Sequence, residues 1–159
     1  MEKGRMKLEP VYLDALSDIS YQVQLPVEES GLPEFMHFAF RGAYRDGAEG
    51  KTDAQYITAI VAAHDAVWQT NAFIIDLSEL VYQWGDEMHC IWDIGYERWC
   101  RCHRPLAIIV SEKCGPALKT LDQQEYERFA VQSFDEALSS IRRQKPIYER
   151  CVREGYLSS

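Results

Sequence analysis

Four carboxylates and a histidine in one short stretch of the chain have the residue types needed for acid–base chemistry. The carboxylates belong to Asp76, Glu79, Asp86 and Glu87, and His89 follows Asp86 by three residues. Residues three apart on a helix are neighbours, so Asp86 and His89 would form a carboxylate–imidazole pair. One alternative for the chain is therefore an enzyme that uses Asp76, Asp86 and His89.

The enzyme alternative lacks a nucleophile and a recognisable cofactor motif. The sequence has no phosphate-binding Gly-rich loop, no Gly-x-Ser-x-Gly elbow and no His-Glu-x-x-His pair. Carboxylates at the start of a helix are also expected from the helix dipole alone. We therefore predict that the chain is not an enzyme, that it has no catalytic residue and that it needs no cofactor.

Cys100, Cys102 and His103 are the other residues whose types suit a site, in this case a metal site. If residues 86–103 are helical, the two thiols lie about 200° apart around the axis and cannot share an ion. The five cysteines are an odd number, and the N-terminus carries no apolar segment of a secretory signal. The sequence therefore predicts no metal site, free thiols rather than disulfides, and a cytoplasmic location.

A buried strand must position the carboxylates. Residues 72–75 form a short apolar run, typical of a strand buried on both faces, and the run stops at Asp76. A second segment, residues 80–82, leads to residues 83–86, after which apolar residues recur at helical spacing. In open α/β sheets, ligands and partners bind beyond the carboxyl ends of the strands. We therefore expect the functional surface in the loop between this strand and the helix.

The rest of the pattern predicts further strands. Residues 19–25 alternate between apolar and polar, and the apolar run 35–40 follows a turn region, so the two form a hairpin with a long loop. Residues 106–110 are a second buried strand, and residues 129–131 form a short edge strand.

Helices are predicted between these strands. A capping box of Thr52 and Gln55 opens one helix, whose apolar stripe includes His64; a histidine there is more often packed and hydrogen-bonded than functional. Pro116 suits the first turn of a short helix that ends at Leu121, and a second capping box at Ser133 opens the last helix.

The sum is an α/β fold, a single mixed β-sheet of four to five strands with about four helices. We divide it into an N-terminal extension (residues 1–18), an α/β domain (19–143) and a solvated C-terminal tail (144–159). The length of 159 residues suits one domain, and the net charge of −8 argues against nucleic acid and anionic membranes as partners. No apolar run is long enough for membrane insertion.

The sequence resembles the STAS domain of sulfate transporters and bacterial anti-sigma-factor antagonists. The similarity covers about residues 19–143, and its segments are FAFRGAY, FIIDLSELVY, PLAIIVSE and FAVQSFDEALSSI. The resemblance implies a protein partner, and in the phosphorylation switches of the family an Asp-Ser-Ser-Gly motif whose second serine is phosphorylated. An ungapped alignment puts Trp84, Gly85, Asp86 and Glu87 at those positions. Asp86 thus occupies the phospho-acceptor position, and neither serine is present.

We therefore predict a non-enzymatic regulatory or protein-interaction module that docks a partner of unknown identity. The predicted contact residues are Tyr82, Trp84, Gly85, Asp86 and Glu87. The alternatives are a small-anion or ligand-binding domain at the same helix N-terminus, and the enzyme described above. Formation of a homodimer is left open.

Overall fold

The predicted hairpin forms one edge of a five-stranded sheet with the order β1-β2-β3-β6-β7, in the part of the chain that the computed structural model describes, residues 6–27 and 30–157. Only β1 runs antiparallel to its neighbour, and the other pairs are parallel. The strands are β1 (Ser20–Gln24), β2 (Met36–Ala43), β3 (Phe73–Val81), β6 (Leu106–Ile109) and β7 (Ala130–Val131). The mixed sheet, its central strand and its hairpin are thus confirmed, although Glu28 and Glu29 of the hairpin loop lie outside the described residues.

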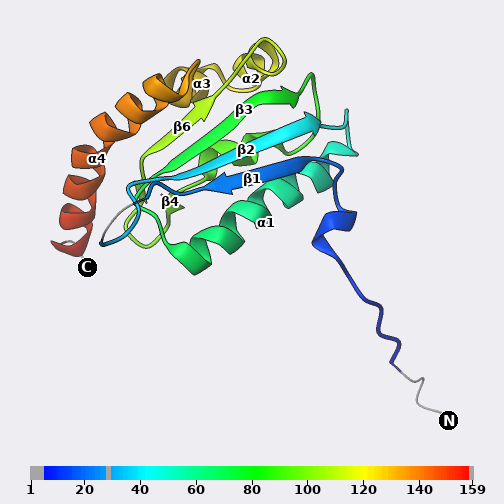
Figure 1. Cartoon of the computed structure of the whole chain (residues 1–159), viewed down its shortest axis with the longest axis horizontal. Helices are drawn as coiled ribbons and strands as arrows, with labels where there is room; N and C mark the ends of the chain where they lie inside the picture. Colours follow the sequence, from blue (N-terminus) through cyan, green and yellow to red (C-terminus); the bar gives the residue numbers. More distant parts are fainter. Residues whose placement is uncertain (1–5, 28–29, 158–159) are drawn as a thin grey trace.

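Helices cover both faces of the sheet (Figure 1). The larger core lies between the sheet and α1 (Gly50–Trp68), the 3-10 helix η2 (Met88–Asp93), α2 (Gly115–Leu121) and α3 (Gln123–Phe129). The smaller core lies under α4 (Phe134–Leu157), where Ala137 and Ile141 pack on Ile74 and Ala107. Ile74 and Ile75 point to opposite faces, and both are fully buried, as predicted for a central strand.

The sequence predicted that the central strand stops at Asp76, and this prediction is wrong. The strand has nine residues, from Phe73 to Val81, and Asp76 lies within it, half-buried on the same face as Ile74. The register against β2 shifts between Ala39 and Arg41, so a bulge lets the strand carry its polar residues and then return Leu80 to the core. The apolar run therefore marked only the buried half of the strand.

The helix predicted to begin near residue 86 is also wrong. Only the six residues of η2 are helical, followed by a small hairpin of β4 (Tyr96–Glu97) and β5 (Cys102–His103). Glu87, Gly95 and Arg101 have φ values of 68°, 89° and 55°, which a right-handed helix interior excludes. The apolar residues at helical spacing therefore do not share one buried face. Met88 and Ile91 are buried, whereas Trp99 is exposed.

The prediction that all five cysteines are free is wrong for one pair. Cys102 forms a disulfide with Cys151, 49 residues further along the chain, while Cys90, Cys100 and Cys114 are free thiols. The partner of Cys102 comes from residues 144–157, which we expected to be a solvated tail but which continue α4. Sequence spacing within residues 100–103 gave no sign of that distant helix.

The two capping boxes had different outcomes. The first helix begins at Gly50 rather than at Thr52, whose hydroxyl donates instead to the Glu49 carbonyl. At the start of α4 the backbone N–H of Glu136 donates to Ser133 Oγ at 3.2 Å, as predicted. The division into extension, domain and tail stays a prediction. In the described residues, no helix combines the length and the apolar character needed to cross a membrane.

Candidate docking surface

The loop that follows β3, residues 82–87, is bonded to the loop that follows β2, residues 44–50. Gly47 and Gly85 form a parallel β-bridge, in which Gly47 N–H donates to the Trp84 carbonyl at 3.2 Å and Asp86 N–H donates to the Gly47 carbonyl at 2.9 Å. Sheet-type bonding therefore continues beyond the carboxyl ends of two parallel strands. This is the edge of the sheet where the sequence placed the functional surface.

Two glycines allow the loops to approach each other so closely. A Cβ on Gly85 would lie 2.5 Å from the Arg45 carbonyl oxygen and 2.5 Å from the ring of Tyr44, and a Cβ on Gly50 would lie 2.4 Å from the same ring. These distances are far inside van der Waals contact, so neither position has room for a side chain. Gly85, predicted as a contact residue, is thus required by the crossing of the loops.

Two tyrosines support the loop from the core side. Tyr44 and Tyr82 meet edge to face, with their ring centroids 5.1 Å apart. The Tyr44 hydroxyl donates to the Asp86 carbonyl and the Tyr82 hydroxyl donates to the Gly85 carbonyl. Burial raises the pKa of both hydroxyls, so they remain protonated donors at neutral pH. Tyr82 is only 4% exposed, so the structure places it beneath the predicted contact residues rather than among them.

The side chains of Trp84, Asp86 and Glu87 lie at the surface. Trp84 is 63% exposed, and its ring lies over Gly47, 3.3 Å from the position that a Cβ there would take. Beside it is an open groove with a volume of about 640 Å³. The opposite wall of the groove belongs to α2, with Pro116, Ala117, Thr120 and Leu121. We call this groove, together with Trp84, Asp86 and Glu87, the docking surface.

An ion pair between the exposed Arg45 and a buried carboxylate fixes the loop that follows β2. The Asp53 carboxylate is almost fully buried and accepts from the backbone N–H of Arg45 at 2.8 Å, from the Arg45 guanidinium and from the Ser17 hydroxyl. Burial alone would raise the pKa of Asp53, but these hydrogen bonds lower it, so the group stays charged. Arg45 also donates to the Leu16 carbonyl at 2.6 Å, which anchors the N-terminal segment that leads away from the body in Figure 1.

The residues of the enzyme alternative do not form an acid–base cluster. Asp76 lies 3.6 Å from His37 and accepts from the hydroxyl and the backbone N–H of Ser78. Burial would raise the pKa of Asp76, but its bonds to His37 and Ser78 lower it to about 2, so it is a poor general acid or base at neutral pH. His89 is exposed, and its Nε2 lies 4.0 Å from a carboxylate oxygen of Glu87.

The anion-binding alternative depended on the N-terminus of an α-helix after residue 86. The structure has there only the six-residue helix η2, and its preceding residue, Glu87, adopts a left-handed conformation with no side-chain cap. The dipole of so short a 3-10 helix is small, because few peptide units add to it. The N-terminal field on which that alternative rested is therefore weak at this place.

His64 is packed and hydrogen-bonded, as predicted. Its Nδ1 lies 2.7 Å from the Ile60 carbonyl oxygen, and its ring contacts those of Tyr21, Phe38 and Trp68. The candidate metal ligands also separate, because Cys102 is in the disulfide and both ring nitrogens of His103 contact backbone carbonyls. Among residues 6–27 and 30–157, no three His, Cys, Asp or Glu side chains come together as a metal site.

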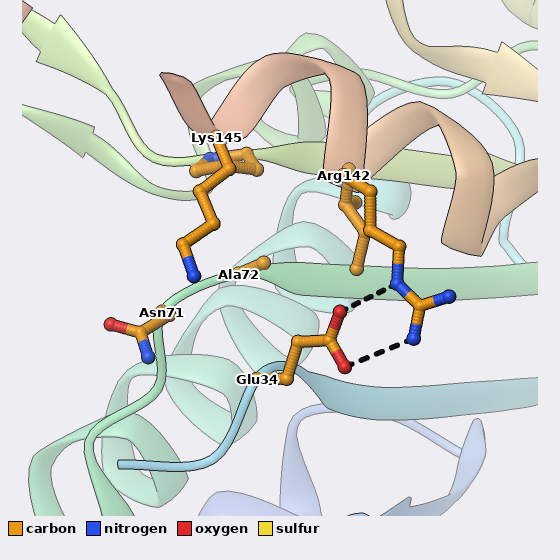
Figure 2. A pocket seen from close by; sticks show the side chains of 7 residues that line it. Glu34, Asn71, Ala72, Arg142 and Lys145 are labelled. Atoms are coloured by element: carbon orange, nitrogen blue, oxygen red, sulfur yellow. Dashed lines mark hydrogen bonds and ion pairs between the residues drawn. The ribbon is translucent and has the colours of Figure 1, made fainter. Parts of the chain in front are cut away.

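Figure 2 shows a second hollow, at the amino ends of β2 and β3. The carboxylate of Glu34 receives two hydrogen bonds from Arg142 of α4, at 2.7 and 3.2 Å, and Lys145 extends beside them toward the start of β3. The hydrogen bond from Arg142 lowers the pKa of Glu34. With a volume of about 20 Å³ the hollow holds roughly one water molecule, so it is too small for a ligand.

A mixed sheet with this strand order, with helices on both faces, defines a fold of the STAS type. It is similar to the crystal structure of an anti-sigma factor antagonist from Mycobacterium paratuberculosis, with a TM-score of 0.53 and 15% sequence identity over 77% of this chain and 95% of that chain. At this identity the similarity establishes a shared fold, which confirms the fold that the sequence predicted. No family model matches the chain, and no curated protein matches it in sequence.

Sequence reasoning missed half of the docking surface. It gave residues 46–51 no part in the site, whereas Gly47 and Gly50 let the loop after β3 pack in place. It also did not connect α2 with Trp84. Gly47 and Gly50, three residues apart, were the sequence feature that could have indicated a close backbone contact. Only the fold shows that the loop after β3 makes this contact.

Proposed function

We propose that the chain is a non-enzymatic regulatory module that docks a protein partner through the docking surface. The observation that carries the proposal is Trp84, a large aromatic side chain in an exposed position. Its loop is held by hydrogen bonds to both the N–H and the carbonyl of Gly47. A rigid exposed aromatic residue beside a groove is typical of a binding hot spot, because little conformational entropy is lost when it is buried. The anti-sigma-factor-antagonist fold supports a protein as the partner.

Asp86 gives the surface a fixed negative charge at the position where switch proteins of the family would carry phosphoserine. Its carboxylate supplies about one charge, whereas a phosphoserine supplies about 1.5 to 2. No hydroxyl is present in residues 84–87 to accept a phosphate. We therefore infer that the surface binds its partner constitutively rather than after phosphorylation at this position.

The test compares what the parent chain and two variants retain from extract of the native cell. Trp84→Ala should reduce retention of the partner at least tenfold, since truncation at a hot spot costs about 2 kcal/mol or more. Asp86→Asn keeps the shape and removes the charge, so it should weaken capture, reduce the salt dependence of capture and change the fold little. Thermal midpoints measured in parallel establish that both variants are folded.

Trp68→Ala is the matched control, because Trp68 is also an exposed tryptophan and ends the helix that begins at Gly50. At 1.5 Å per residue it lies about 27 Å along that helix from the loops. It should retain the same proteins as the parent. If folded Trp84→Ala and Asp86→Asn chains retrieve the same proteins in equal yield, the proposal is wrong.

A further inference from the structure

The disulfide is a covalent link between the second half of α4 and the β4–β5 hairpin. The first half of α4 is anchored by the buried residues Ala137, Ser140 and Ile141, and by the bond from Arg142 to Glu34 seen in Figure 2. None of residues 146–157 is buried. This second half is attached to the β4–β5 hairpin by the disulfide from Cys151, by a hydrogen bond from Tyr148 to Glu97 and by the contact of Tyr156 with Trp99.

Pro146 separates the two halves of α4. A proline inside a helix has no N–H to donate to the carbonyl four residues before it, and its ring crowds that carbonyl, so the helix is weakened at this point. In Figure 1, α4 bends along its length. The disulfide thus closes the end of a helix that already contains a hinge.

A cavity of about 440 Å³ lies against the disulfide, within the size range of small-molecule sites. Its lining includes Cys102, Cys151 and the guanidinium-bearing side chains of Arg101 and Arg128, and among the described residues that line it there is no carboxylate. The charge of Arg128 is offset in part by Glu125, 3.9 Å away. In a chain of net charge −8, this is a local site of positive charge.

We infer that the Cys102–Cys151 disulfide is a thiol–disulfide exchange site, whose reactant is a small thiol that carries carboxylates and binds in this cavity. Its carboxylates would pair with Arg101 and Arg128, which places its sulfur against the disulfide. The opening of the disulfide releases the second half of α4 from the hairpin. This inference does not depend on the docking surface.

The exchange proceeds in two balanced steps. The thiolate of the small thiol attacks Cys151 Sγ, because Cys151 is half-buried whereas Cys102 is only 1% exposed. A bond forms between these two sulfurs, the Cys102–Cys151 bond breaks, and Cys102 leaves as a thiolate that takes a proton from water. A second small thiolate attacks the mixed disulfide and releases the Cys151 thiolate. Two small thiols are oxidised to one disulfide, and the protein gains two electrons and two protons.

The free thiols elsewhere in the chain are poor sites for the same chemistry. Burial raises the pKa of Cys90 to about 12, and burial also raises the pKa of Cys114, so neither is a thiolate at neutral pH. Cys100 is a free thiol close to the disulfide, because it lies in the β4–β5 hairpin and its Cβ is 3.2 Å from the position that a Cβ on Gly155 of α4 would take. It therefore offers a matched control in the experiment.

The first experiment measures the rate of opening in the oxidised full-length protein. Reduced glutathione, which is anionic, and 2-mercaptoethanol, which is neutral, are each added, and free Cys102 and Cys151 are alkylated and quantified by mass spectrometry. The double variant Arg101→Gln/Arg128→Gln should slow the reaction with glutathione at least about threefold and leave that with 2-mercaptoethanol within about twofold. Lys51→Gln/Lys119→Gln removes the same charge outside the cavity and should change neither rate.

The second experiment measures hydrogen–deuterium exchange of α4. Opening by glutathione should increase exchange in residues 146–157 and leave residues 134–142 protected. Cys151→Ser should show the same increase without any thiol, whereas Cys100→Ser should behave like the parent. Equal slowing of both thiols by the arginine variant, no slowing of either, a Cys102–Cys151 pair that glutathione leaves closed, or unchanged exchange after opening would each overturn the inference.

Discussion

The loops beyond the carboxyl ends of β2 and β3 and the elements around the Cys102–Cys151 disulfide are held by opposite means. At the docking surface the chain is fixed by backbone hydrogen bonds and by two glycines that permit close approach. Around the disulfide the two strands of the hairpin have only two residues each, and side chains add much of the fixing: the disulfide, Arg104 and Gln144. Backbone hydrogen bonds do not depend on redox conditions, whereas a disulfide opens under reducing conditions.

The largest effect should follow from removing Arg104. Its guanidinium makes two bonds to Asp65, at 2.7 and 3.0 Å, lies 3.4 Å from Glu97 and covers the ring of Phe73. Arg104→Met would leave two half-buried carboxylates uncompensated, so we expect a loss of about 3 kcal/mol in the free energy of unfolding, measured in urea. Arg104→Lys should lose less, because it keeps the charge. Equal stability of Arg104→Met and the parent would mean that this region does not depend on side-chain pairing.

A smaller effect should follow from Gly85→Ala at the docking surface. The added Cβ must displace the Arg45 backbone or the Tyr44 ring, which costs about 1–3 kcal/mol. Gly155→Ala, in α4, meets only Cys100 Cβ at 3.2 Å and gains helix propensity, so we expect a change within about 0.5 kcal/mol. Chemical denaturation of both variants gives the two numbers. If the two alanines cost the same, close backbone approach is not what distinguishes the docking surface.

Asp76, which lies in β3, should make the free energy of unfolding depend on pH in the acid range. Its pKa falls from 3.8 to about 2 on folding, so the stability it contributes is complete above pH 4 and is lost as the pH falls from about 4 to about 2. The free energy of unfolding of the parent should therefore exceed that of Asp76→Asn by about 1–2 kcal/mol at pH 5, and the difference should disappear near pH 2. Asp86→Asn, at an exposed position, is the control. A difference that does not vary with pH would contradict the ionic role of Asp76.

The smallest effect is expected from metal chelation. Cys102 is committed to the disulfide, and Cys100 and His103 contact backbone carbonyls, so the described residues provide no four-ligand site around them. We predict that a chelator leaves the thermal midpoint unchanged. A large decrease, together with about one zinc per chain in metal analysis, would show that a metal rather than a disulfide holds this region.

The same comparison explains what the sequence could predict. The hairpin, the central strand, the strand from Leu106 and the short helix after Pro116 all follow from local periodicity or from the chemistry of one residue. Residues 88–103 do not, since Met88, Ile91 and Trp92 recur at helical spacing whether the chain forms one long helix or a single 3-10 turn. The left-handed conformations of Glu87 and Arg101 carry no glycine signal.

The sequence predicted where the loop of Trp84 and Asp86 lies in the fold, but not how that loop is built. The rule that partners bind beyond the carboxyl ends of strands led to Trp84 and Asp86, and both are exposed there. The contact of Gly47 with Gly85 and the pairing of Cys102 with Cys151 join segments far apart in the chain. Such contacts depend on the completed fold, which no window of sequence contains.

The Gly47–Gly85 bridge has a kinetic consequence. Because the loop of residues 82–87 is already bonded in the free chain, the proposed partner would not have to wait for it to become ordered, and association would need no preceding conformational step. We therefore expect the observed association rate to rise in proportion to partner concentration without reaching a plateau. Substitutions of Trp84 should then shorten the residence time of the complex while leaving the association rate constant nearly as it was.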